Sequence, residues 1–222
     1  MSAYAAPSAA ELHLLFTLSD SALPTGGFIA SSGLESYAKH GFLVSSSSPA
    51  SFSSYPNPAS IPSQALTEFA RAEVEHYANT TAVFVISAFK CVESALSIST
   101  EEKGREKPID ELVHVDAFHE ATLLSHVSRR SSKAQGVALL TLFSRGLAVP
   151  TGFGPSTSDP KHETELDPAG ERGGRDIVMG YKRLIRAGRA MGHLAVCWGV
   201  MTAVLGLSLG TSFILLSFPI WL

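Results

Sequence analysis

Apolar residues recur at helical spacing through most of this chain, and this periodicity limits the possible folds more than any other feature. The apolar positions are three or four residues apart within residues 66–96, 110–128, 137–147 and 176–185. One face of an α-helix repeats in this way, whereas a strand alternates every second residue. Strand-type alternation is hard to find anywhere in the chain. The sequence therefore predicts an all-α fold, a bundle of roughly seven or eight helices joined by long irregular loops.

The sequence contains two candidate helix caps and several apolar stripes that could pack in a core. Ser63 and Asp176 are residue types that cap helix N-termini, so we expect helices to begin at these positions. The stripes that we expect to face the core contain Leu66, Phe69, Val74, Val85, Phe89, Val92, Leu112, Val115, Phe118, Val127, Ile177 and Tyr181.

Local composition divides the chain into one helical domain and several irregular segments. We expect residues 1–222 to form a single domain. Residues 45–63 are rich in Ser and Pro and predict a flexible insertion, and residues 99–108 predict a short charged loop. Residues 150–174 contain Gly, Pro, Ser and Asp without periodicity and predict an irregular loop. Residues 210–222 form an apolar tail of unusual composition.

The last part of the chain carries no charged side chain. From Ala190 to Leu222 there is no Asp, Glu, Lys or Arg, which is long enough for a membrane-spanning helix. Several glycines and Pro219 interrupt this run, and the buried helices of an all-α core have the same composition. The sequence favours buried helices, and a tail-anchored membrane protein is the alternative.

Charge and cysteine content exclude several classes of protein. The net charge is −3, so no overall attraction to nucleic acid is expected. Cys91 and Cys197 are the only cysteines and form no C-x-x-C motif, which excludes a disulfide scaffold and a cysteine zinc cage. This cysteine content fits a reducing compartment, and we expect the protein to be cytoplasmic.

Motifs for catalysis and metal binding are missing or weak. The sequence contains no P-loop, no G-x-S-x-G and no H-E-x-x-H motif, so it does not predict an enzyme. His114 and His119, with Asp116 between them, are weak candidates for a metal site. Five residues place the two histidines about 140° apart around a helix, so a solvated helix face is the favoured interpretation. His193 lies among apolar residues, which is typical of a hydrogen-bonded core histidine.

Residues 12–43 predict two helices joined by a rigid turn. Pro24, Gly26 and Gly27 form the turn, because Pro fixes φ and Gly permits positive φ. The longer stretch SDSALPTGGFIASSGLE, residues 19–35, resembles the N-terminal signature of the urease accessory protein F (UreF) family. Two other segments resemble motifs of the same family. They are Arg129-x-x-Ser132-x-x-Gln135-Gly136-x-x-Leu139-Leu140, and Gly192-His193 followed by Gly199 and Leu205-Gly206-Leu207.

The resemblance implies an all-α urease maturation factor that is not an enzyme. Members of this family form a complex with urease accessory proteins D (also called H) and G, which delivers nickel to apo-urease. The G-type partner is the GTPase, so GTP would bind to a partner, nickel would be handled by the complex, and this chain would need no cofactor. A homodimer within the complex is implied, and a weak nickel-binding protein is a further alternative.

The resemblance also implies which residues contact partners. We expect a role in shaping the first turn or in partner contact for Pro24, Gly26, Gly27, Phe28, Ser32 and Glu35. On the central helix we expect a polar face formed by Arg129, Ser132 and Gln135, with Gly136 allowing a neighbouring helix to approach closely. His193 belongs to the third motif. Arg129 has two interpretations, a charge-assisted contact to a partner or a solvated side chain on a helix surface.

Overall fold

The computed structural model describes residues 9–18, 34–42, 63–97, 106–147 and 168–212. These residues form eight α-helices and one π-helical turn, and they include no strand. The elements are α1 (Ala9–Leu18), α2 (Leu34–Lys39), α3 (Ser63–Thr80), α4 (Ala82–Ser97), α5 (Glu106–Thr122), α6 (His126–Leu142), η3 (Phe143–Leu147), α7 (Pro168–Arg186) and α8 (Leu194–Val204). The predicted all-α fold is therefore confirmed.

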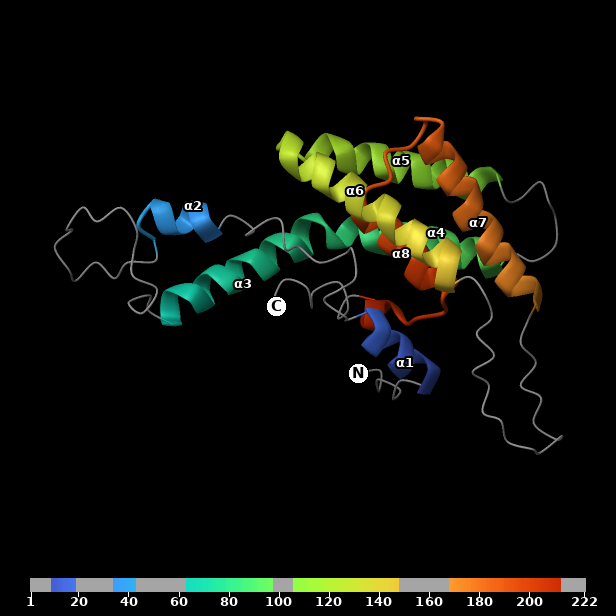
Figure 1. The fold of residues 1–222 in the computed structure, drawn as a ribbon, viewed down its shortest axis with the longest axis horizontal. Coiled ribbons are helices and arrows are strands. Elements are labelled where there is room, and N and C mark those ends of the chain that lie inside the picture. Colours follow the sequence, from blue (N-terminus) through green and yellow to red (C-terminus); the bar gives the residue numbers. More distant parts are fainter. Residues whose placement is uncertain (1–8, 19–33, 43–62, 98–105, 148–167, 213–222) are drawn as a thin grey trace.

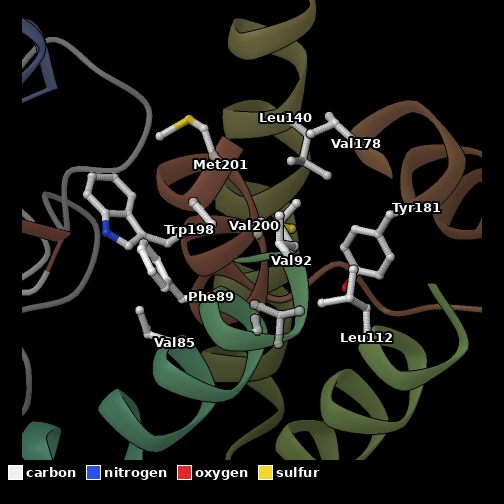
Figure 2. Packing of buried hydrophobic residues seen from close by; sticks show 14 of the residues in the cluster. Val85, Phe89, Val92, Leu112, Leu140, Val178, Tyr181, Trp198, Val200 and Met201 are labelled. Carbon is white, nitrogen blue, oxygen red and sulfur yellow. The ribbon is translucent and has the colours of Figure 1, made fainter. Parts of the chain in front are cut away.

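Helix α8 is the centre of the bundle, and its composition explains this position. All nine residues from Ala195 to Ala203 are buried, because a helix that is apolar on every side is stable only when it is covered on every side. Its most extensive neighbours are α4 and then α6, with α5 and α7 completing the cover (Figure 1). Figure 2 shows side chains from these helices gathered around α8. Gly199 lets α4 approach closely, since a Cβ there would lie 2.5 Å from the Val85 carbonyl oxygen.

Burial in this core explains much of the uncharged run that begins at Ala190. Helix α8 has eleven residues and spans about 16 Å, roughly half the hydrocarbon thickness of a bilayer. One stretch of the described residues, Ser63–Ser97, is long and apolar enough to cross a membrane. This is weak evidence, because its second half is the core helix α4, and core helices pass the same test.

Helix α3 continues the line of α4 away from the bundle, with α2 lying beside it (Figure 1). The predicted apolar stripe of α3 does not face the core, because no described side chain of this helix is buried. Phe69 instead packs against Tyr37 of α2, with ring centroids 5.1 Å apart. The stripes of α4, α5 and α7 behave as predicted at most positions, but Phe118 and Val127 are exposed. Periodicity identifies the apolar face of a helix and does not determine which helix covers it.

Several predicted boundaries are wrong. Residues 110–128 do not form one helix, because α5 ends at Thr122 and α6 begins at His126. The caps of α6 explain the break, since the side chain of Ser125 accepts a hydrogen bond from the Ser128 N–H. Helix α7 begins at Pro168, so Asp176 lies inside it and does not cap it. The predicted insertion at 45–63 lies almost wholly outside the described residues, as does most of the tail from 210.

Candidate functional site

The start of α8 is held by side chains from two other helices. Asp116 of α5 accepts three hydrogen bonds from the N–H groups of residues 191–193, at 2.6, 2.7 and 3.0 Å. The Ser132 hydroxyl of α6 accepts a fourth from the Leu194 N–H at 3.1 Å. The first N–H groups of a helix have no partner within the helix, and a carboxylate there also interacts favourably with the helix dipole. The three bonds to its carboxylate explain how a fully buried Asp116 is tolerated.

Two glycines let the backbones meet at this point. Gly192 has a φ of 74°, in the left-handed region that favours glycine. Gly136 of α6 faces the same segment, and a Cβ on it would lie 2.2 Å from the Gly192 carbonyl oxygen and 2.9 Å from the His193 carbonyl carbon. The central motif and the Gly192-His193 motif are therefore in direct backbone contact, although 56 residues separate Gly136 from Gly192 in the chain.

His193 has a hydrogen-bond partner for each ring nitrogen and is fully buried. Its Nδ1 lies 3.1 Å from the Ser132 hydroxyl oxygen, and its Nε2 lies 2.6 Å from Oε2 of Glu120. Because the Ser132 oxygen already accepts from Leu194, its O–H is free to donate to Nδ1, which leaves the proton of a neutral ring on Nε2. Burial lowers the pKa of His193, against the opposing effects of Asp116 and Glu120. We call Asp116, Ser132 and His193 the polar lock.

Glu120 connects the polar lock to the surface. Its side chain is 24% exposed and lies 3.0 Å from the Lys133 ammonium and 4.0 Å from the Arg129 guanidinium. Arg129 also donates from Nε to the Leu123 carbonyl at the corner between α5 and α6. Burial raises the pKa of Glu120, but hydrogen bonds from Lys133 and His193 outweigh this effect and hold the pKa below its ordinary value. Glu120 is therefore ionised, and Glu120, Arg129 and Lys133 form what we call the charged rim.

Aromatic and apolar side chains adjoin the lock and the rim. His119 is buried and stacks on Phe84 with ring centroids 4.4 Å apart, and its Nδ1 has no hydrogen-bond partner. Burial, with a smaller contribution from His193, lowers the pKa of His119 to about 4. On the outside of the same helix Phe118 is 68% exposed, and Leu124 at the corner is 91% exposed. Large apolar side chains that are this exposed are typical of protein-binding surfaces when they lie beside fixed polar groups.

The structure places the predicted partner-binding residues in three groups. Four are brought together at the lock and rim: Arg129, Ser132, Gly136 and His193. Gly136 and His193 are buried, so they support this site from beneath. Gln135 is half-buried on α6, and Glu35 is exposed on α2. Five lie outside the described residues: Pro24, Gly26, Gly27, Phe28 and Ser32.

The weak metal candidates are not arranged as a ligand set. His114 is exposed, whereas Asp116 is buried and already accepts three N–H groups. Within the described ranges no group of three His, Cys, Asp or Glu side chains is placed to hold a metal ion. Glu120 and Lys133 were not predicted as site residues from the sequence. Glu120 is four residues after Asp116, and Lys133 is four after Arg129, so helical spacing was the signal that linked them.

The described residues form an all-α bundle in which two sequence motifs meet and position a charged, partly apolar surface. Comparison with known proteins identifies the family. The model of the UreF family matches residues 62–218, and the chain belongs to the UreF family.

Two curated relatives, both fungal, are similar over most of this chain. "Urease accessory protein 6" of Cryptococcus neoformans is 48% identical over 217 residues, covering 90% of this chain and 65% of the relative. An "Uncharacterized urease accessory protein UreF-like" of Schizosaccharomyces pombe is 27% identical over 202 residues, covering 91% and 64%. The chain thus spans just under two thirds of the length of these relatives. No solved structure gives a significant match.

Proposed function

We propose that the protein is a urease maturation factor that acts as an adaptor and not as an enzyme. In this role it binds urease accessory proteins of the D (or H) and G types and apo-urease, in a complex that inserts nickel into urease and couples to the partner GTPase. Membership of the UreF family and the 48% identity to a urease accessory protein support this proposal. We further propose that it acts in the cytoplasm, as a homodimer within the complex.

The observation that carries the adaptor role is the rigid link between the charged rim and the core. Glu120 receives a hydrogen bond from the buried His193 ring, which is itself bonded to Ser132. The position of the Glu120 carboxylate is therefore fixed before any partner arrives. Charges that are already ordered lose less conformational entropy on binding, and they select partners of complementary charge.

The exposed apolar residues beside the rim complete this surface. Leu124 projects from the corner between α5 and α6, next to the backbone that Arg129 holds. Protein interfaces combine an apolar centre with a polar border, and the corner offers both within a few residues. We propose that Leu124 and Phe118 enter the partner's surface while Arg129 and Lys133 pair with acidic groups around it.

Co-purification tests this proposal. The full chain is co-expressed with the D-type and G-type accessory proteins and urease, and both complex formation and urease activation are measured. We expect Leu124→Asp and Lys133→Glu to reduce both readouts. Arg71→Glu on α3 is the matched control, because Arg71 is an exposed arginine paired only with Glu75 of its own helix.

Two results decide the outcome. If both variants co-purify and activate urease as well as the control does, the lock and rim are not the docking site. If the unmodified, folded chain binds neither accessory protein, the adaptor role itself is rejected. Circular dichroism of each variant separates a lost contact from a lost fold.

A further inference from the structure

One face of α7 carries a row of basic side chains remote in sequence from the charged rim. Arg175, Lys182 and Arg186 are separated by seven and four residues, which places them on one face of a helix. Arg145 of η3 lies near enough to Lys182 to act on its charge. Figure 1 shows α7 at the outside of the bundle. We call Arg145, Arg175, Lys182 and Arg186 the basic stripe.

Lys182 joins the two elements of this stripe. Its ammonium donates to the Ser144 hydroxyl oxygen at 2.9 Å and to the Leu140 carbonyl oxygen at 3.4 Å. Ser144 in turn donates to the same carbonyl. These bonds hold η3, and with it Arg145, against α7. Lys182 and the backbone that carries Arg145 are therefore held in place, and the three arginines are exposed around them.

No carboxylate in the part of the chain that the structure describes pairs with the basic stripe. Within the described residues, the ion pairs involve Arg71, Arg129, Lys133 and His193, and none involves a member of the stripe. Lys182 is only 8% exposed, and lysines are buried almost only when they are paired. Burial lowers the pKa of Lys182, and the neighbouring charges of Arg186 and Arg145 lower it further. Among the described residues, Lys182 therefore has two neutral hydrogen-bond acceptors and no anionic partner.

The shape and charge of the stripe indicate what kind of anion fits. Eleven residues of helix separate its ends, a length of about 16 Å. An extended peptide of roughly five residues covers this distance. The chain as a whole has a net charge of −3, which opposes the approach of a long polyanion such as nucleic acid. Arginine forks bind carboxylates through two parallel hydrogen bonds, and the exposed Arg145 and Arg186 form no ion pair with any described residue.

We propose that the basic stripe is a docking site for a short, carboxylate-rich segment of a partner protein. Arg145, Arg175 and Arg186 contact the carboxylates, and the ammonium of Lys182 beneath them adds positive potential. The site stands on the contacts of α7 with η3 and with the end of α6. It does not depend on the lock and rim or on the role in urease maturation.

Peptide binding by the full chain provides the test. Fluorescence anisotropy of labelled hexaglutamate is followed as the protein is added, with hexaglutamine as the uncharged control probe. The variant is Arg145→Gln with Arg186→Gln. The matched control is Arg71→Gln with Lys90→Gln, which removes the same net charge at exposed residues of α3 and α4. We expect at least a tenfold loss of hexaglutamate affinity in the first variant and less than a twofold loss in the second.

Lys182→Met adds a readout that a purely structural lysine would not give. Methionine is similar in size and removes a buried charge that has no carboxylate partner among the described residues. We expect this gain to exceed the loss of the bonds to Ser144 and Leu140, so the urea midpoint of unfolding should rise. Hexaglutamate affinity should fall in the same protein. Opposite changes in stability and binding support the docking site.

Four results would overturn the proposal. They are equal losses in the two double variants, equal binding of hexaglutamine, no change in affinity with Lys182→Met, and tighter binding of an RNA oligonucleotide of equal charge than of hexaglutamate.

Discussion

Replacing Gly136 by alanine tests the close approach of α6 to the start of α8. The new methyl group would lie 2.2 Å from the Gly192 carbonyl oxygen and 2.9 Å from the His193 carbonyl carbon. Both are backbone atoms, so no side-chain rotation relieves the overlap. Helix α6 has to move away from the start of α8 by about 1 Å to restore van der Waals contact.

The expected loss of stability follows from two opposing effects. Alanine in the middle of a helix is favoured over glycine by about 1 kcal/mol. Overpacking costs about 1–3 kcal/mol, and the displacement also strains the buried hydrogen bonds of Ser132 to Leu194 and His193, each worth about 1 kcal/mol. We therefore expect the free energy of unfolding to fall by about 2 kcal/mol. For a chain of this size this corresponds to roughly 4–8 °C in melting temperature.

Gly146→Ala is the matched control for this measurement. Gly146 lies in η3, and a Cβ there would meet no heavy atom within 4 Å. Urea unfolding followed by circular dichroism gives the free energy for both variants. We expect Gly146→Ala to lie within about 1 kcal/mol of the original protein. Equal stability of the two variants would refute the argument that α6 and α8 are in backbone contact at Gly136.

Three further predictions concern the lock, the buried histidine and the exposed corner. Asp116→Asn should lower the free energy of unfolding by about 2–4 kcal/mol in urea titrations, because three buried N–H groups lose a charged acceptor. A change below 0.5 kcal/mol, on the order of an ordinary surface substitution, would contradict this. His119 has a folded pKa of about 4 against an ordinary value of 6.5, so between these values only the unfolded state binds its proton. Stability should then fall as the pH falls through this window, by up to about 1.4 kcal/mol per pH unit, and His119→Phe should flatten the slope in unfolding titrations. Leu124→Ser should change the free energy of unfolding by less than about 0.5 kcal/mol, since the side chain is 91% exposed, while weakening co-purification with the accessory proteins.

The sequence predicted the fold class because helical periodicity is a local signal. Leu112, Ile177 and Tyr181 are buried as their spacing predicted. The extent of α7 was missed because its glycines looked like loop residues. Gly174 instead allows close packing of two helices, since a Cβ there would lie 2.7 Å from a methyl group of Val204. A glycine run has the same appearance in a loop and at a helix crossing, and only the neighbouring helix distinguishes them.

The candidate site was partly predictable for a related reason. Arg129, Ser132 and Gly136 are spaced three and four residues apart, so the sequence alone places them on one face of α6. The residues that this face meets come from other parts of the chain. Asp116 lies 75 residues from the first N–H group that it accepts. A local sequence pattern does not predict a contact between residues this far apart in the chain. The polar lock was therefore found only in the structure.

Asp116 and Lys182 show why the type of a residue does not determine its role. The sequence offered Asp116 as a metal candidate because carboxylates bind metals. Its oxygens are instead occupied by three N–H groups, and releasing them would leave buried donors unsatisfied at about 1–3 kcal/mol each. Lys182 was not predicted as a site residue from the sequence. In the structure its buried charge has no carboxylate partner among the described residues. A buried charge that is fully compensated supports the fold, whereas one that lacks compensation indicates where a ligand is expected to bind.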